Sequence, residues 1–262
     1  MNTRPWSNAL VTGASSGLGD ALARRLAADG VDVVAVARDV ARLERLSGEA
    51  GPGAVEVLPA DLTTTDGRAL VAARLAADER AVDLAIANAG VWQFGDLVDQ
   101  DPATLRSMIE LNVVAVVELT HAAVTAMRRR GGGAVVLISS IAGNQPLAHE
   151  AVYGASKAFV SSFGQAVAEE LRGSDVSLTT IMPGLVRTEL HERVGGSHHV
   201  ALLPDRAWMD ADVVAASIIE ATAAHRVVHT PGFVNRVVSS LTDMTPRAIS
   251  RRAAATVNRK RR

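Results

Sequence analysis

The chain has 262 residues, no cysteine and a formal net charge of −1 at pH 7. The lack of cysteine excludes disulfides, thiolate nucleophiles and cysteine-ligated metals, and the balanced charge gives no overall attraction to nucleic acid. Hydrophobic residues make up 48% of the chain and charged residues 21%, which is typical of a folded domain with a sizeable core and not of a disordered chain.

The sequence contains no segment that has the pattern of a signal peptide or of a membrane span. Residues 1–8 are polar and are followed by only a short apolar stretch, without a cleavage site of small residues. The most apolar helical stretch, Asn112 to Met127, contains Glu118 and His121 and falls short of the roughly 18 uninterrupted apolar residues that a span needs. We therefore expect a cytoplasmic protein without integral membrane association.

Short β-branched segments alternate along the chain with longer alanine-rich segments whose apolar residues recur at helical spacing. The expected strands are Ala9 to Thr12, Val31 to Ala37, Ala54 to Pro59, Leu84 to Asn88, Ala134 to Ser139, Ser177 to Met182 and Val227 to Thr230. The expected helices are Gly19 to Asp29, Val40 to Glu49, Thr64 to Ala77, Pro102 to Arg129, Tyr153 to Arg172 and Val213 to Ala224. This alternation predicts an α/β fold with a parallel sheet that helices cover on both faces.

Two parts of the chain depart from this pattern. Thr188 to Asp210 has no clear periodicity, and we expect residues 188–212 to form a substrate-binding lid. The histidines of this segment have no suitably spaced carboxylate, so we expect no metal site at His191, His198 and His199. Residues 246–262 form a basic C-terminal tail that we expect to be solvated; the alternative is recruitment to nucleic acid or to an anionic membrane, which salt-dependent binding lost with the tail would support.

A glycine-rich turn follows the first expected strand and opens the first expected helix. It has the spacing Gly-x-x-x-Gly-x-Gly and comprises Thr12, Gly13, Ala14, Ser15, Ser16, Gly17, Leu18 and Gly19. Glycines let the backbone approach a pyrophosphate closely, and free N–H groups at the start of a helix point toward the anion. Because the spacing differs from the usual Gly-x-Gly-x-x-Gly fingerprint, a tight turn without a ligand is the alternative.

The second expected strand ends at Ala37 and Arg38, where the side chain present determines which ribose is accepted. An acidic residue there binds a 2′-hydroxyl, whereas an arginine accommodates a 2′-phosphate. The position carries a guanidinium and no carboxylate, which favours NADP(H) over NAD(H). Asp39 follows directly and favours NAD(H).

Tyr153 and Lys157 are four residues apart and therefore share one face of an expected helix. Tyr153 is the only tyrosine of the chain and Lys157 is one of two lysines, which indicates a role that a guanidinium does not fill. We expect the Lys157 ammonium, with help from an oxidised nicotinamide ring, to lower the pKa of the phenol so that Tyr153 serves as acid and base. Ser140, at the end of a strand, would hydrogen-bond the substrate oxygen; the alternative role for Ser140 is a turn cap.

These motifs together resemble the classical short-chain dehydrogenase/reductase family. The resemblance rests on Thr12 to Gly19, Asn88-Ala89-Gly90, Ser140, Tyr153, Lys157 and Pro183-Gly184, and it covers the chain from Asn8 to about Leu190. It implies one Rossmann-type domain over residues 1–262, with a doubly wound parallel sheet. It also implies a homodimer or homotetramer, although the sequence after Phe233 lacks the glycine-rich assembly segment that many members have.

The resemblance further implies a role for each matching residue. The catalytic residues would be Asn112, Ser140, Tyr153 and Lys157, of which Asn112 would hold a water in the proton relay and Lys157 would also bind the ribose. The cofactor-binding residues would be Thr12, Gly13, Ser15, Ser16, Gly17, Leu18, Gly19, Arg38, Asp61, Leu62, Asn88, Ala89, Gly90, Tyr153, Lys157, Pro183, Gly184, Val186 and Thr188.

The expected function is an NADP(H)-dependent oxidoreductase that acts on a small ketone, aldehyde or secondary alcohol. The alternatives are a member that prefers NAD(H) and a cofactor-binding scaffold without turnover. An apolar substrate pocket is expected from Trp92, Phe94, Ile141, Leu147 and Leu185, with polar groups from Asn144, Gln145 and His149.

Overall fold

A seven-stranded parallel sheet runs through the middle of the molecule, in the computed structural model that describes residues 5–188 and 205–244. Its strand order is β3-β2-β1-β4-β5-β6-β9, and every neighbouring pair is parallel. The strands are β1 (Asn8–Thr12), β2 (Asp32–Ala37), β3 (Val55–Pro59), β4 (Leu84–Ala87), β5 (Gly133–Ile138), β6 (Val176–Ile181) and β9 (Val228–His229). The predicted strands are thus confirmed, and the order is that of a Rossmann-type doubly wound sheet.

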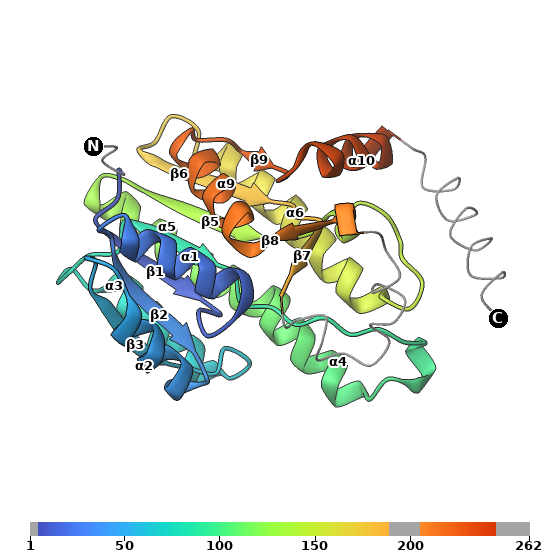
Figure 1. Ribbon diagram of the computed structural model, residues 1–262, viewed down its shortest axis with the longest axis horizontal. Coiled ribbons are helices and arrows are strands. Elements are labelled where there is room, and N and C mark those ends of the chain that lie inside the picture. Colours follow the sequence, from blue (N-terminus) through green and yellow to red (C-terminus); the bar gives the residue numbers. More distant parts are fainter. Residues whose placement is uncertain (1–4, 189–204, 245–262) are drawn as a thin grey trace.

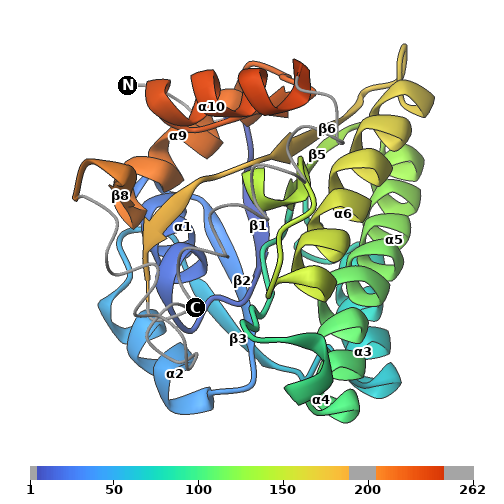
Figure 2. The ribbon, with the colours of Figure 1, turned by 90° about the vertical axis from the view of Figure 1, so that its right-hand side faces the viewer.

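Helices cover both faces of this sheet (Figures 1 and 2). The longer helices are α1 (Gly17–Ala28), α2 (Val40–Glu49), α3 (Thr65–Ala76), α4 (Pro102–Ile109), α5 (Ala115–Arg130), α6 (Ala151–Glu170), α9 (Ala211–Ala223) and α10 (Phe233–Met244). Figure 2 shows α1, α2 and α9 on one face and α3, α5 and α6 on the other. The central strands β1 and β5 and most of β2 are buried, as expected of a parallel sheet that both layers shield from water, whereas the edge strand β3 is only partly buried.

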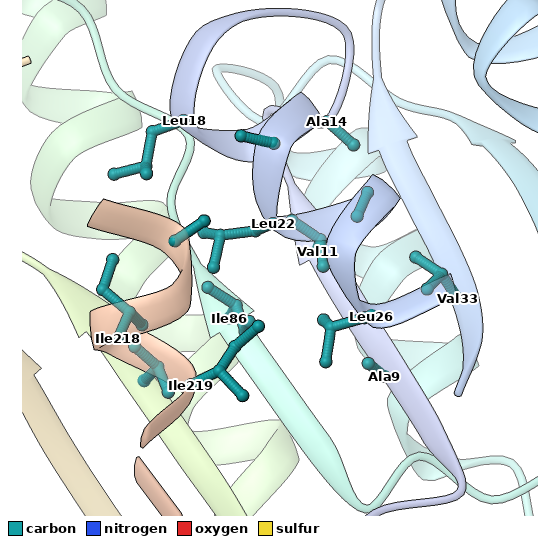
Figure 3. Packing of buried hydrophobic residues seen from close by; sticks show 14 of the residues in the cluster. Ala9, Val11, Ala14, Leu18, Leu22, Leu26, Val33, Ile86, Ile218 and Ile219 are labelled. Carbon is teal, nitrogen blue, oxygen red and sulfur yellow. The ribbon is translucent and has the colours of Figure 1, made fainter. Parts of the chain in front are cut away.

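The core on the α1 face shows why the alanine-rich segments form helices. Leu22 and Leu26 lie one helical turn apart on α1 and face Ile218 and Ile219 of α9 over Val11 of β1 (Figure 3). All five side chains are buried. Burial of each large aliphatic side chain contributes about 1.5–3 kcal/mol, so this periodic apolar stripe is what docks the first helix onto the sheet.

The long helix predicted over Pro102 to Arg129 is continuous but is not a uniform α-helix. Residues Glu110–Val114 form a π-helical turn between α4 and α5. The helix begins at Pro102, as predicted, and Asp101 caps its first turn by accepting from the N–H groups of Ala103 and Thr104. Gly131 ends it in the left-handed region at φ +84°. By length and composition alone the run 102–130 is able to cross a membrane, but α5 packs its apolar side against the sheet and α3 as a core helix.

The region after β6 differs from the prediction in its described part. Two three-residue strands, β7 (Leu185–Arg187) and β8 (Trp208–Asp210), pair in parallel as a second small sheet, where irregular chain was expected. Residues 189–204 of the predicted lid and residues 246–262 of the predicted basic tail lie outside the described residues.

Candidate active site

A cleft of about 940 Å³ lies at the carboxyl ends of β1 to β6. It includes the point where the strand order reverses, between β1 and β4, which is where doubly wound sheets bind ligands. The cleft is lined by these residues predicted for the cofactor and the reaction: Gly13, Ser15, Ser16, Gly17, Leu18, Arg38, Asp61, Leu62, Asn88, Ala89, Gly90, Ser140, Tyr153, Lys157, Pro183, Gly184, Val186 and Thr188. Three predicted residues, Thr12, Gly19 and Asn112, lie behind this lining.

The glycine turn presents the start of α1 to the cleft. The Val36 carbonyl accepts from the N–H groups of Gly13 (2.8 Å) and Ala14 (3.2 Å), so the N–H groups left for a ligand are those of the first turn of α1, which have no acceptor within the helix. Gly13 has φ +71°, and a Cβ there would lie 2.9 Å from Asn88 Nδ2. The structure therefore contains the tight turn, and the N–H groups at the start of α1 fit an anionic phosphate.

Thr12 does not face the cleft but joins the glycine turn to the turn after β4. Its hydroxyl oxygen accepts from the N–H groups of Asn88 (2.9 Å) and Ala89 (3.0 Å), and Asn88 Nδ2 donates to the Thr12 carbonyl at 2.8 Å. These bonds hold two of the predicted cofactor segments side by side. Thr12 thus fixes the position of the glycine turn relative to the turn after β4.

At the tip of β2, Arg38 extends its guanidinium to the rim of the cleft, where its side chain is 70% exposed. Its Nη1 lies 3.9 Å from Asp61 Oδ2. Burial works to raise the pKa of Asp61, but hydrogen bonds from the N–H and hydroxyl groups of Thr63 and the charge of Arg38 outweigh it, so that the pKa lies below its usual value. Arg42, in the first turn of α2, also lines this rim. It was not predicted from the sequence, because an arginine four residues after another is common and does not by itself indicate a binding site.

A buried arginine connects this end of the cleft to the π-helical turn. Arg68 of α3 is only 5% exposed, and its Nη1 donates to the carbonyl oxygens of Leu62 (3.2 Å) and Thr63 (3.1 Å). The same nitrogen lies 3.2 Å from Glu110 Oε2, and Nε lies 2.9 Å from Glu118 Oε2. The guanidinium charge is therefore matched by two carboxylates, as a buried cation requires.

Ser140, Tyr153 and Lys157 meet in the middle of the cleft, as predicted. Ser140 follows β5, and its oxygen accepts from Ala142 N–H at 3.1 Å, so it is also the cap of a short helical turn. Tyr153 and Lys157 lie one turn apart on α6, with the Lys157 nitrogen 5.9 Å from the centre of the Tyr153 ring. Lys157 is buried and donates to the Ile138 carbonyl at 2.9 Å, which leaves two ammonium hydrogens for a ligand.

The pKa of Tyr153 corrects one prediction from the sequence. Burial raises this pKa to about 12; a hydrogen bond from Ser140 opposes the increase and the charge of Glu150 adds to it. Burial also lowers the pKa of Lys157 to about 8. The lowered phenol pKa expected from Lys157 was wrong for the chain alone, because withdrawal of the hydroxyl from water outweighs an ammonium that does not touch it.

Asn112 lies in the π-helical turn, fully buried behind the cleft. Its amide nitrogen donates to the Val91 carbonyl (2.9 Å) and to Ser156 Oγ (3.2 Å), and its Oδ1 accepts from Val91 N–H (3.0 Å). Ser156 Oγ in turn donates to the Tyr153 carbonyl at 2.7 Å. The side chain therefore links the loop after β4 to the start of α6, and both of its N–H groups are already used.

Loops after β4 and β5 form the substrate end of the cleft. Of the residues predicted for a substrate pocket, the cleft is lined by Trp92, Ile141, Gln145, Leu147 and Leu185, and not by Phe94, Asn144 or His149. Phe94 lies behind the lining, in contact with the rings of Trp92 and His149. Glu150 also lines this end and was missed, because a lone carboxylate before a helix looks like a cap.

The described residues contain no group of three His, Asp or Glu side chains that is arranged to hold a metal ion. The three histidines considered for metal binding, His191, His198 and His199, fall outside the described part of the chain.

Comparison with known proteins agrees with this geometry. A family model described as short chain dehydrogenase matches residues 7–197. An uncharacterized oxidoreductase of Myxococcus xanthus is 40% identical over 192 residues, which cover 72% of this chain and 76% of that protein.

Two solved structures share the fold over most of their length. A short-chain dehydrogenase from Sphingobium yanoikuyae in complex with NADPH has a TM-score of 0.80 at 32% identity, covering 92% of this chain and 97% of that one. A serine dehydrogenase complexed with NADP+ has a TM-score of 0.77 at 28% identity, covering 85% and 93%. The chain therefore belongs to the short-chain dehydrogenase family of oxidoreductases.

Proposed function

We propose that this oxidoreductase prefers NADP(H) and acts on a small ketone, aldehyde or secondary alcohol. When bound, the nicotinamide supplies or accepts the hydride. The cleft fits such a dinucleotide: the first turn of α1 offers N–H groups to the phosphates, and the Lys157 ammonium keeps two hydrogens for the ribose. Further support comes from the relatives above that are complexed with NADPH or NADP+.

In the reducing direction, the carbonyl carbon gains the hydride and the carbonyl oxygen gains the proton of the Tyr153 hydroxyl. Ser140 Oγ lies in the same part of the cleft and donates a hydrogen bond to that oxygen as negative charge develops on it. The raised pKa of Tyr153 keeps the phenol protonated and ready to donate. In the oxidising direction the phenol must first lose its proton, which nearby positive charge, from Lys157 and from an oxidised nicotinamide ring, makes easier.

The observation that carries the cofactor preference is the guanidinium of Arg38 at the tip of β2. It is mostly exposed, lines the cleft and makes a long contact with Asp61, which leaves its other nitrogens able to pair with a 2′-phosphate as far as the described residues show. Asp39 does not offset this, because its carboxylate accepts from Arg42 N–H as the cap of α2 and also pairs with the Arg42 side chain at 3.4 Å. The alternative of NAD(H) preference rests on Asp39 alone.

The cofactor-binding scaffold without turnover remains the second candidate. Against it stands the meeting of Ser140, Tyr153 and Lys157 in one cleft, because a scaffold has no need of that arrangement. We further propose a homodimer or homotetramer in the cytoplasm, with no nucleic-acid partner.

Titration of the purified protein with NADPH and with NADH, followed by nicotinamide fluorescence, tests the proposal. We expect selective binding of NADPH, and loss of that selectivity in Arg38→Asp, by about 10- to 100-fold in the ratio of dissociation constants. Arg172→Asp is the matched control, since Arg172 has a similarly exposed side chain (76%) and does not line the cleft. Binding of neither cofactor would refute both the proposed function and the cofactor-binding scaffold and would favour a scaffold free of cofactor. An unchanged ratio in Arg38→Asp would refute the role of Arg38.

A further inference from the structure

Glu150 is a carboxyl group at the substrate end of the cleft that the proposed reaction does not use. It lies three residues before Tyr153 and is half-buried. Burial raises its pKa, while a hydrogen bond from the Trp92 side chain and the charge of His149 oppose the increase. The group is thus partly removed from water beside the proton donor.

Helix capping does not account for this carboxyl group. Glu150 occupies the N-cap position of α6, but its side chain accepts no hydrogen bond from the N–H groups of the helix. The N-cap carboxylates of α2 and α4, Asp39 and Asp101, do accept such bonds. The Glu150 side chain therefore points away from the role that its position would otherwise give it.

No arginine or lysine among the described residues forms an ion pair with Glu150. Other carboxylates near the cleft have such partners: Asp61 faces Arg38, and Asp39 faces Arg42. The hydrogen bond from Trp92 and the charge of His149, which also faces Asp96, offset only part of the cost of removing the Glu150 carboxylate from water, because its pKa stays raised. A cationic ligand would remove that cost.

The backbone before Glu150 is held in an uncommon conformation. His149 has φ +68°, in the left-handed region that residues other than glycine rarely adopt. Three contacts keep it there: His149 Nδ1 lies 2.7 Å from Asp96, its carbonyl accepts from Gly95 N–H at 2.9 Å, and its ring contacts Phe94. Such strain persists where the surroundings fix a functional position, and here it fixes the direction in which the chain enters α6.

We propose that Glu150 binds an ammonium group of the substrate, so that the preferred substrates are amino ketones and the matching amino alcohols. This proposal rests on the proposed oxidoreductase function and names the substrate class of the same site. Side chains three positions apart at a helix start have Cβ atoms about 5–6 Å apart. The ammonium would therefore be only a few bonds from the carbonyl carbon that faces Tyr153.

The reaction keeps the usual balance of atoms. An amino ketone, NADPH and one proton give an amino alcohol and NADP+; the carbonyl carbon gains the hydride and the oxygen gains the proton from Tyr153. The ammonium is unchanged and serves only for recognition. A ketone that carries a carboxylate at the same distance would be repelled by Glu150.

Three ketones of nearly equal size and different charge test the proposal: aminoacetone (cationic), butanone (neutral) and pyruvate (anionic). In the wild-type protein kcat/KM with NADPH should be about 10- to 100-fold higher for aminoacetone than for butanone, and lowest for pyruvate. In Glu150→Gln, which keeps the shape and removes the charge, the ratio of aminoacetone to butanone should fall toward one. Asp99→Asn, the same change of charge at an exposed position of the loop after β4, should keep the wild-type ratio.

The outcomes separate this proposal from the proposed function. If butanone is reduced but the ratio is the same in the wild type and in Glu150→Gln, the role of Glu150 is refuted and the oxidoreductase stands. If NADPH does not bind and no ketone is reduced, the proposed function fails and the substrate class falls with it. Should Glu150→Gln fail to fold, calorimetric binding to the wild type saturated with NADP+ decides: 1-aminopropan-2-ol must bind more tightly than butan-2-ol, and equal binding would refute the proposal.

Discussion

Asn112 holds the main chain of Val91 from both sides: its Nδ2 donates to the Val91 carbonyl at 2.9 Å, and its Oδ1 accepts from the Val91 N–H at 3.0 Å. The pair fixes the loop after β4 against the π-helical turn. A Cβ added at the preceding Gly90 would lie 3.3 Å from Asn112 Oδ1 and 3.4 Å from Lys157 Nζ. The side chain thus acts as a positioning group, because both of its N–H groups are used within the chain.

Asn112→Ala should lower the free energy of unfolding by about 2–4 kcal/mol, because it leaves the N–H and C=O groups of Val91 without their partner. Urea unfolding followed by circular dichroism measures this change. Gln165→Ala, which loses the side-chain bond to the Ser161 carbonyl at an exposed position of α6, should cost about 1 kcal/mol. Equal costs for the two variants would contradict a special role for the Asn112 pair.

Tyr153→Phe should reduce kcat by about 100- to 10,000-fold, the contribution of general acid catalysis, and leave the dissociation constant of NADPH nearly unchanged. Ketone reduction and nicotinamide fluorescence give the two values. Ser162→Ala, an exposed change on the same helix, is the control and should keep wild-type turnover. Full activity in Tyr153→Phe would exclude the phenol as proton donor.

Stability should rise with pH between about pH 8 and pH 10. The pKa of Lys157 is about 8 in the folded protein and ordinarily 10.5, so in this range the unfolded chain binds more protons than the folded one. The slope should approach about 1.4 kcal/mol per pH unit at its steepest. Tyr153, with its pKa raised to about 12, works in the opposite direction only above about pH 10.

Urea unfolding at pH 8, 9 and 10 measures this slope. The chain has no cysteine and only one tyrosine, so few other groups titrate in the range. In Lys157→Met the slope should vanish. A slope that persists in this variant would show that another group is responsible.

Two glycine substitutions in helices should have opposite effects on stability. A Cβ at Gly19 would overlap the Gly13 carbonyl oxygen and the Asn88 side chain, so Gly19→Ala should cost about 1–3 kcal/mol and weaken NADPH binding. A Cβ at Gly48 of α2 meets no atom within 4 Å, so Gly48→Ala should stabilise the protein by about 0.5–1 kcal/mol. Thermal unfolding of both variants tests the contrast, and destabilisation by Gly48→Ala would contradict it.

The parts of the fold that were predictable from the sequence are those with a local signal. The apolar period of 3.6 on α1 and the buried runs of β1 and β2 specify their elements directly. The π-helical turn at Glu110–Val114 was not predictable, because one extra residue in a turn changes the hydrogen bonds without changing the types of residue. The pairing of β7 with β8 was missed because three-residue strands are too short to show alternation.

The candidate site was predictable at positions where a residue type that is rare in this chain suits one particular chemical role. Tyr153 and Lys157 stand out as rare residues at helical spacing. The sequence shows which charges are near these residues but not how far their side chains are withdrawn from water, so it did not reveal that burial raises the pKa of Tyr153 in the chain without cofactor. Glu150 was missed for a related reason, since only the three-dimensional contacts of His149 show that the loop turns it into the cleft.

Arg68 fixes the distance between two segments that border the cleft. Its guanidinium donates hydrogen bonds to the carbonyls of Leu62 and Thr63 and forms an ion pair with Glu110, at the start of the π-helical turn. The Leu62–Thr63 segment and the π-helical turn are therefore held at a fixed distance in the folded chain, before any ligand binds. The entropy lost in ordering them belongs to folding and not to the binding of a ligand.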